Sequence, residues 1–363
     1  MNETFAIVYQ LEPTPSLKRF AEGIQHVMES NGYRLGDERD PHIQLVFNMV
    51  DPRHPRHFRR KGKGTFVITV AENHQPVDDT FRSAYPVLIQ SLGNMMIFLD
   101  RYTNPEKTFF ITLEQGCYPL ASHEGDSTYY QDVFKRIRPL ASSQLVIDNT
   151  FHPDLPEDLR EGDTVTNELI QSGKKLDGMN LLPTPFPIEE LLPDKAYRHV
   201  QRLYGIGGLS YGNLSARREE SQFWMSARGV NKAQLQQIGR DILLIKGYDP
   251  DNLSMEISVP ADIEPKRASV DAIEHWMIYT EHPEVGAIVH IHAWMEGIPS
   301  TEINYPCGTV QLAEAVAQKI REAEDPSRAV IGLKNHGLTI TGRDLNDIFE
   351  RIQGKIIPQV PMT

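Results

Sequence analysis

Apolar positions in the first 150 residues alternate between short continuous runs and helical spacing. The runs at residues 5–9, 43–49 and 65–70 predict strands, because short apolar stretches bounded by turn residues are typical of buried strands. Between the first two runs, Thr14-Pro15 opens a segment whose apolar side chains recur three and four residues apart. This segment predicts a helix that ends at Asn31-Gly32.

The same alternation continues to about residue 150. It predicts a long helix over residues 81–100, a strand over 108–113, a helix over 129–137 and a strand over 144–147. Strands that alternate with helices predict an α/β domain around a central sheet. The runs 43–49 and 65–70 are also compatible with an antiparallel hairpin, so a mixed sheet is expected.

Proline then interrupts the pattern. Pro183, Pro185 and Pro187 fall within five residues, and proline is disfavoured in helix interiors and central strands alike. We therefore predict a linker here, which separates an N-terminal α/β domain, residues 1–185, from a second domain, residues 186–363.

The second domain carries the chemistry that stands out most. Residues 287–294 read as a buried strand in which His290 and His292 are two positions apart, so both side chains project from one face. His336 follows another β-branched run and precedes Gly337, where a backbone can approach a site closely. Three neutral imidazoles with an open position form a catalytic zinc arrangement. The alternative is a histidine pair on a half-exposed strand face, with His336 as an ordinary turn residue.

Composition limits the classes of protein to consider. The length of 363 residues favours two domains, and 40% hydrophobic residues suffice for ordinary globular cores. No apolar run approaches the roughly 20 residues of a membrane helix. The start of the chain lacks a signal-like apolar core, so a soluble, cytoplasmic protein without membrane association is expected.

Charge and cysteine content add two local features. The net charge of −12 argues against general nucleic-acid binding, although residues 53–63 form a basic segment that is either a solvated loop or a phosphate-binding one. Cys117 and Cys307 lie far apart and are expected to be reduced thiols. We interpret Cys117 as a packed residue rather than a nucleophile.

Motifs in the second half, over about residues 195–357, resemble the class II aldolase/adducin family, which includes fuculose-phosphate aldolase. Five of them occur in order: Gly212-Asn213-Leu214-Ser215, Phe223-Trp224-Met225-Ser226-Ala227-Arg228-Gly229, Val289-His290-Ile291-His292, Cys307-Gly308-Thr309 and Asn335-His336-Gly337. The resemblance implies an α/β/α sandwich with a mostly antiparallel sheet. It further implies a divalent metal, usually Zn²⁺, held by His290, His292 and His336, and a homo-oligomer such as a tetramer. Residues 1–185 show no such resemblance.

The resemblance also implies roles for residues around the metal. Asp271 matches the position of the family's acid/base glutamate, and Glu274, one turn further along the helix, is the alternative if the shorter side chain does not reach. The positions that hold the substrate's anionic end correspond to Asn213, Ser226, Arg228, Gly229 and Ser269. Arg228 departs from the small hydroxyl residue expected there.

These features predict a metal-dependent lyase of the aldolase type. Its substrate would be a small anionic, sugar-like hydroxy-carbonyl compound that reacts through an enediolate. Dehydratase, decarboxylase and epimerase activities of the same family are the alternatives. A non-catalytic, adducin-like interaction module is a further alternative, because the segment between His292 and Gly308 is short and could leave part of the pocket wall missing.

Overall fold

The structure is a computed structural model that describes residues 3–113, 116–183, 188–204 and 211–362. The chain forms two compact units, which comprise Met1–Ser142 with Phe186–His199, and Ser143–Pro185 with Val200–Thr363. Residues 184–187, in the predicted linker, and residues 205–210 lie outside the described residues. No helix in the described ranges has the length and apolarity that crossing a bilayer requires.

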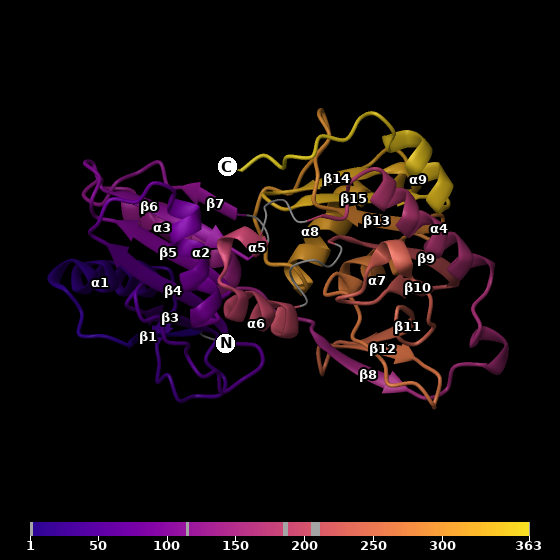
Figure 1. Cartoon of the computed structure of the whole chain (residues 1–363), viewed down its shortest axis with the longest axis horizontal. Coiled ribbons are helices and arrows are strands. Elements are labelled where there is room, and N and C mark those ends of the chain that lie inside the picture. The colour runs from indigo at the N-terminus through magenta and orange to yellow at the C-terminus, as the bar shows by residue number, and fades with distance from the viewer. Residues whose placement is uncertain (1–2, 114–115, 184–187, 205–210, 363) are drawn as a thin grey trace. The chain divides into compact units, whose positions relative to one another are not determined.

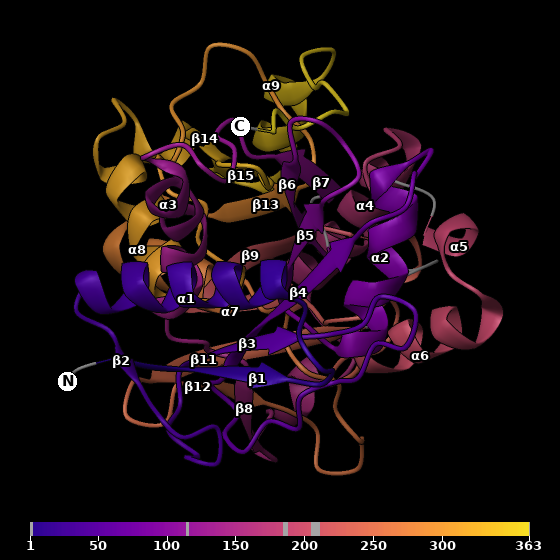
Figure 2. The same ribbon diagram turned by 90° about the vertical axis from the view of Figure 1, so that its left-hand side faces the viewer.

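The first unit is built on a seven-stranded sheet of order β2-β1-β3-β4-β5-β6-β7 (Figure 1). Its elements are β1 (Thr4–Tyr9), α1 (Pro15–Ser30), β2 (Arg34–Leu35), β3 (Leu45–Met49), β4 (Phe66–Asn73), α2 (Thr80–Ser91), β5 (Met95–Asp100), β6 (Lys107–Thr112), β7 (Gly116–Pro119), α3 (Tyr129–Ala141) and α5 (Ile188–Leu191). The chain leaves the first unit within helix α6 (Asp194–Tyr204), after His199. Helix α1 packs beside α3, whereas α2 contacts β5, β6 and β7 (Figure 2).

The predicted mixed sheet is confirmed, but the predicted hairpin is wrong. Strands β1 to β5 pair in parallel, and β6 and β7 add antiparallel pairs at one edge. Since β3 and β4 are parallel, residues 50–65 must run back along the sheet as a crossover. Phe58 fixes this basic segment by packing with Val46 and Val67, while most of its charged side chains are exposed.

The predicted helix over residues 81–100 divides into α2 and β5. Helix α2 ends where Leu92 adopts a left-handed conformation with φ 54°, and β5 begins three residues later. Strand β5 lies between β4 and β6 and is buried at every position, so its apolar run has no strand-like alternation. Periodicity alone therefore did not distinguish it from a continuing helix.

The second unit is built on an eight-stranded sheet of order β14-β15-β13-β9-β10-β11-β12-β8. Its elements are β8 (Asp148–His152), η1 (Glu157–Leu159), α4 (Thr164–Gly178), β9 (Asn213–Glu219), β10 (Gln222–Ser226), η2 (Lys232–Gln234), β11 (Ile242–Asp249), β12 (Ser254–Ser258), α7 (Ala272–Glu281), β13 (Ala287–Ile291), α8 (Val310–Arg321), η3 (Pro326–Arg328), β14 (Val330–Leu333), β15 (Gly337–Gly342) and α9 (Leu345–Ile352). All neighbouring strands are antiparallel except β12 and β8. Helix α7 packs against α8, and α4 packs against α9 (Figure 1).

Residues 143–183 pack with this second unit, although the sequence analysis placed them before the domain boundary. Strand β8 pairs with β12 from Asp148 opposite Ser254 to His152 opposite Ser258. Helix α4 contacts β9, β10 and η2. A strand signal shows that a segment is extended, but it does not show which sheet the segment joins. The prolines follow β8 and α4 in the chain, so a boundary placed at the prolines assigned both elements to the first domain.

Gly173 permits the closest approach between α4 and η2. A Cβ atom at this position would lie 1.9 Å from the carbonyl oxygen of Lys232, whereas Gly178 at the end of the same helix has no atom within 4 Å of its added Cβ. We therefore expect Gly173→Ala to lower the free energy of unfolding by about 1–3 kcal/mol through overpacking.

Gly178→Ala is the matched control for this substitution. It is expected to be neutral or slightly stabilising, because alanine is the better helix former. Urea unfolding followed by circular dichroism measures both variants. Equal stability of the two variants would contradict the close packing of α4 on η2.

Candidate metal centre

Strand β13 places two histidines in the centre of the second sheet. It lies between β15 and β9, where His290 is opposite Thr339 on one side and Asn213 on the other. His290 is buried, and His292, just beyond the end of the strand, is half-buried. The two rings lie on one face with their centroids 5.1 Å apart, as the strand period predicted.

The turn between β14 and β15 brings the third histidine to the same point. The backbone of Gly337 approaches β13 so closely that a Cβ atom would lie 2.2 Å from the carbonyl oxygen of Ile291. Glycine is therefore required beside His336. The His336 ring centroid is 4.8 Å from that of His290 and 4.9 Å from that of His292. The three ligand nitrogens lie within 4.8 Å of one another, and the Nε2 atoms of His336 and His292 are 3.2 Å apart.

These histidines are held in the neutral form that binds metals. His290 Nδ1 is 3.0 Å from the carbonyl oxygen of Leu338, so Nδ1 carries the proton and Nε2 presents its lone pair. That Nε2 atom is buried and has no hydrogen-bond partner among the described residues. Burial lowers the pKa of His290 to about 4 and that of His336 to about 3, and it holds the pKa of His292 well below its usual range. The donor set fits a divalent metal ion.

Asp271 lies beside this triad at the N-cap of α7. It is buried, and its Oδ2 atom accepts hydrogen bonds from Asn213 Nδ2 at 2.7 Å and from Ser269 Oγ at 3.4 Å. Its Oδ1 atom has no hydrogen-bond partner among the described residues. Burial raises the pKa of Asp271, although the charges of His336 and Arg228 oppose that rise. A carboxyl group with a raised pKa and one uncommitted oxygen can exchange a proton with a bound molecule.

Glu274 occupies a deeper position on the same helix. It is buried, and its Oε1 atom accepts a hydrogen bond of 2.5 Å from Thr339 Oγ1, on the residue opposite His290. Burial and the charge of Asp271 raise its pKa to about 8, which keeps it largely protonated at neutral pH. Asp271 and His336 each influence the pKa of the other. Asp271 is therefore the better placed of the two predicted acid/base candidates.

The five predicted anion-binding residues divide into two groups. Asn213 and Ser269 bond directly to Asp271, and the guanidinium group of half-buried Arg228 lowers the pKa of that carboxyl. Ser226 instead accepts a hydrogen bond from the backbone N–H of Leu214 at 3.3 Å. Gly229 provides a turn with φ 68°. In the described part of the chain, no hydrogen bond joins Ser226 to Asp271 or to the three histidines.

The structure adds two residues to which the sequence analysis gave no role. Lys232 begins η2 and is only 3% exposed, and its charge interacts with Asp271, His290 and His292. Cys307 Sγ lies 3.3 Å from His336 Nε2. The lysine follows Gly229 in a polar stretch that gave no sign of burial. Cys307 stood within a quoted motif, but proximity to His336 depends on tertiary structure.

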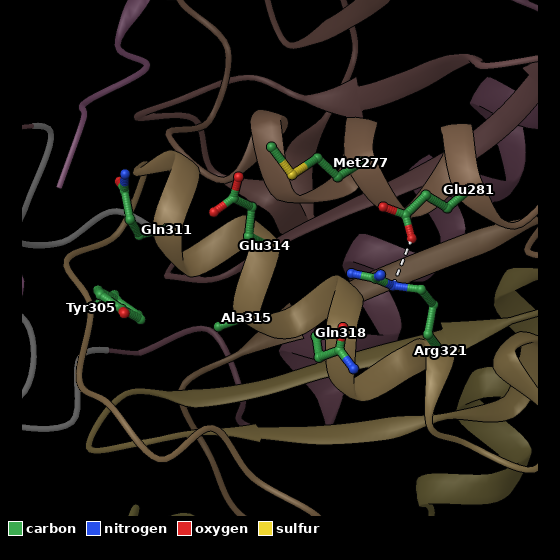
Figure 3. Close-up of a pocket in the computed structure, with 8 residues that line it drawn as sticks. All are labelled: Met277, Glu281, Tyr305, Gln311, Glu314, Ala315, Gln318 and Arg321. Atoms are coloured by element: carbon green, nitrogen blue, oxygen red, sulfur yellow. Dashed lines mark ion pairs between the residues drawn. The ribbon is translucent and has the colours of Figure 1, made fainter.

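A separate pocket of about 600 Å³ lies on α7 and α8 of the same unit (Figure 3). Its lining includes Gln311, Glu314 and the ion pair of Glu281 with Arg321, whose Oε2 and Nε atoms are 3.1 Å apart. None of the predicted site residues lines this pocket. This pocket is therefore distinct from the histidine cluster.

Comparison with known proteins gives a family match for the second unit. No curated protein sequence matches the chain. Among solved structures, L-fuculose 1-phosphate aldolase shares 19% identity with a TM-score of 0.36, over 54% of this chain and 83% of that one. The N-terminal class II aldolase domain of a conserved protein from Thermoplasma acidophilum shares 14% identity with a TM-score of 0.34, over 56% and 94%. A family model confirms the resemblance seen in the motifs for residues 195–298, which match the class II aldolase and adducin N-terminal domain.

Proposed function

We propose that the second unit is a metal-dependent lyase of the aldolase type, which acts on a small, anionic, sugar-like hydroxy-carbonyl compound. The observation that carries this proposal is the convergence of three neutral histidines beside the carboxyl group of Asp271. Among the described residues, the buried Nε2 atom of His290 has no hydrogen-bond partner. The α/β/α sandwich, zinc as the metal and a homo-oligomer such as a tetramer belong to the same proposal.

In this proposal, different residues of the site bind the metal and transfer the proton. His290, His292 and His336 would hold the metal, which when bound supplies Lewis-acid polarisation of substrate oxygens. Asp271 takes up or returns the proton that moves as a carbon–carbon bond is made or broken. Asn213 and Ser269 fix the Oδ2 atom of Asp271, which leaves Oδ1 for the transfer. Glu274 accepts a hydrogen bond from Thr339 and, in this proposal, does not contact the substrate.

Carbon–carbon bond formation tests this function. The zinc-loaded chain is incubated with dihydroxyacetone phosphate and a short aldehyde such as glycolaldehyde, and the products are identified by mass spectrometry. We expect a condensation product that disappears after chelation and returns when zinc is added back. A protein that binds zinc but forms no new carbon–carbon bond would contradict the aldolase proposal and direct the search to dehydratase, decarboxylase or epimerase reactions.

The adducin-like interaction module is the second candidate, and metal analysis separates the two. A purely structural module does not need the lone pair of His290 to be kept free of hydrogen bonds. The absence of a divalent ion from protein purified without chelators would favour the interaction module over the enzyme.

A further inference from the structure

The basic segment of the first unit has a repeat of three residues. An arginine occupies every third position of the sequence Arg53-His54-Pro55-Arg56-His57-Phe58-Arg59. Burial follows the same period, because Pro55 is half-buried and Phe58 is buried, whereas the arginine and histidine positions are exposed. Such a period is typical of an extended backbone with three residues per turn. Three exposed arginines, which we call the arginine row, therefore follow one another along the segment.

Contacts with the sheet fix the backbone of the arginine row. Asn48, buried on β3, donates a hydrogen bond of 2.9 Å from Nδ2 to the carbonyl oxygen of Arg56. Phe58 packs into the apolar cluster of β3 and β4. Just beyond the row, Arg60 Nη2 donates a hydrogen bond of 2.8 Å to Asn94 Oδ1. Because the segment is held in place from both ends, a ligand that binds the row does not have to order it.

The row begins at a topological switch point of the first sheet. Strand β1 connects to β2 on one side, and its parallel neighbour β3 connects to β4 on the other. Ligands of open α/β sheets bind outside the carboxyl ends of the strands at such a point. Here Gln10, which follows β1, donates a hydrogen bond of 3.2 Å to Asn48 Oδ1, and Asn48 holds Arg56. The ends of both strands are therefore linked to the arginine row.

The local charge favours an anion of small size. Residues 51–65 contain six arginine or lysine residues and one acidic residue, Asp51, although the net charge of the whole chain is −12. Asp51 Oδ1 accepts a hydrogen bond of 2.9 Å from the backbone N–H of Arg53 and so stabilises the local turn. At physiological ionic strength the Debye length is about 8 Å, so a compact anion experiences mainly the charge of the segment. A long polyanion also meets the repulsion of the acidic remainder.

The two ends of the segment differ in their surroundings. Gly62 lies so close to the loop before β3 that a Cβ atom would be 2.1 Å from the carbonyl oxygen of Pro41. Asp40 precedes Pro41 in that loop, so acidic residues accompany the lysine-containing end. The arginine row is therefore the better anion site of the two ends.

We infer that the arginine row binds the polyphosphate group of a small ligand. Arginine presents planar N–H donors that bind phosphate oxygens in pairs. Three residues of an extended backbone rise by about 9 Å, so the three long side chains can converge on a short series of linked phosphates. The site lies in the first unit, and it does not depend on the lyase function proposed for the second.

The test measures binding of tripolyphosphate to the full chain by isothermal titration calorimetry. We expect the combined substitution Arg53→Gln, Arg56→Gln and Arg59→Gln to weaken binding by at least about tenfold, and higher salt to weaken binding to the wild type. The titration is repeated in His292→Ala, which accounts for tripolyphosphate bound at a metal in the second unit. Unaltered affinity in the triple variant, or binding that is lost in His292→Ala, would overturn the inference.

A second triple variant removes the same charge elsewhere in the first unit. Arg19, Arg34 and Arg39 are exposed arginines outside the segment, and their combined replacement by glutamine should leave the affinity unchanged. Equal loss in both triple variants would reduce the effect to net charge and contradict a site. Adenosine triphosphate, titrated beside tripolyphosphate, distinguishes a nucleoside triphosphate from an inorganic chain as the source of the phosphates. An RNA duplex that bound more tightly than either through the same arginines would overturn the compact ligand.

A further measurement needs no variant and applies even if the triple variant does not fold. Phenylglyoxal modification of arginines in the wild-type chain is followed by mass spectrometry with and without tripolyphosphate. Tripolyphosphate should slow the modification of the arginine row and leave that of Arg19 unaltered. Equal modification of the row in both conditions would contradict the inference. Neither readout involves turnover, so a failed condensation assay would reject the aldolase reaction without affecting this result.

Discussion

His292→Ala is expected to weaken divalent-metal binding by at least about 100-fold, because it removes one of three nitrogens that converge on one point. His292 is half-buried, so the variant loses a ligand without opening a large cavity in the core. Metal content after dialysis and competition with a chelator measure the effect.

The control for this substitution is His26→Ala, an exposed histidine on α1 of the first unit. It should leave the metal content and affinity unchanged. If His292→Ala retained wild-type affinity, the three histidines would not be the ligands, and the proposed lyase would lose its basis.

Asp271→Asn is expected to reduce turnover by about 10²- to 10⁴-fold, the usual contribution of a positioned proton-transfer group. The amide keeps the shape of the side chain and can still accept the bond from Asn213, but it cannot exchange the proton. Metal content should remain that of the wild type. Steady-state rates of the condensation reaction, measured beside the metal content of the same samples, give the result.

Glu274→Gln distinguishes the two carboxyl groups. Since Glu274 is largely protonated and bonded to Thr339, glutamine reproduces most of its contacts, and turnover should fall much less than in Asp271→Asn. The opposite order of effects would assign the proton transfer to Glu274. Equal and complete loss in both variants would indicate a coupled pair in which neither acts alone.

The part of the fold that could be predicted from the sequence is the part specified by local pattern. The helix over Pro15–Ser30 begins at the predicted Thr14-Pro15 pair and has the predicted apolar face, and β13 presents its two histidines on one side. The parallel pairing of β3 with β4 and the membership of β8 in the second sheet depend on partners distant in the chain. Local periodicity carries no information on either.

The candidate site shows the same division. The strand period predicted that His290 and His292 share a face, and the resemblance to the aldolase family added His336, Asp271, Asn213 and Ser269. The structure brings these residues together. Lys232 could not be selected, because its burial results from the close approach of α4 to η2, and α4 comes from the segment before the prolines. The hydroxyl of Ser226 accepts a hydrogen bond from the backbone of the adjacent strand, and its assignment to an anion pocket stays a prediction.

The chain path between the two units has a consequence for how they can be separated. The chain passes from the first unit to the second after Ser142, returns at Phe186, and passes over again after His199. The units are therefore interleaved along the chain rather than consecutive. A single proteolytic cut at the first passage leaves Phe186–His199 covalently attached to the second unit while it packs in the first. Neither unit therefore corresponds to one continuous stretch of the chain, so neither could be exchanged by one simple recombination event.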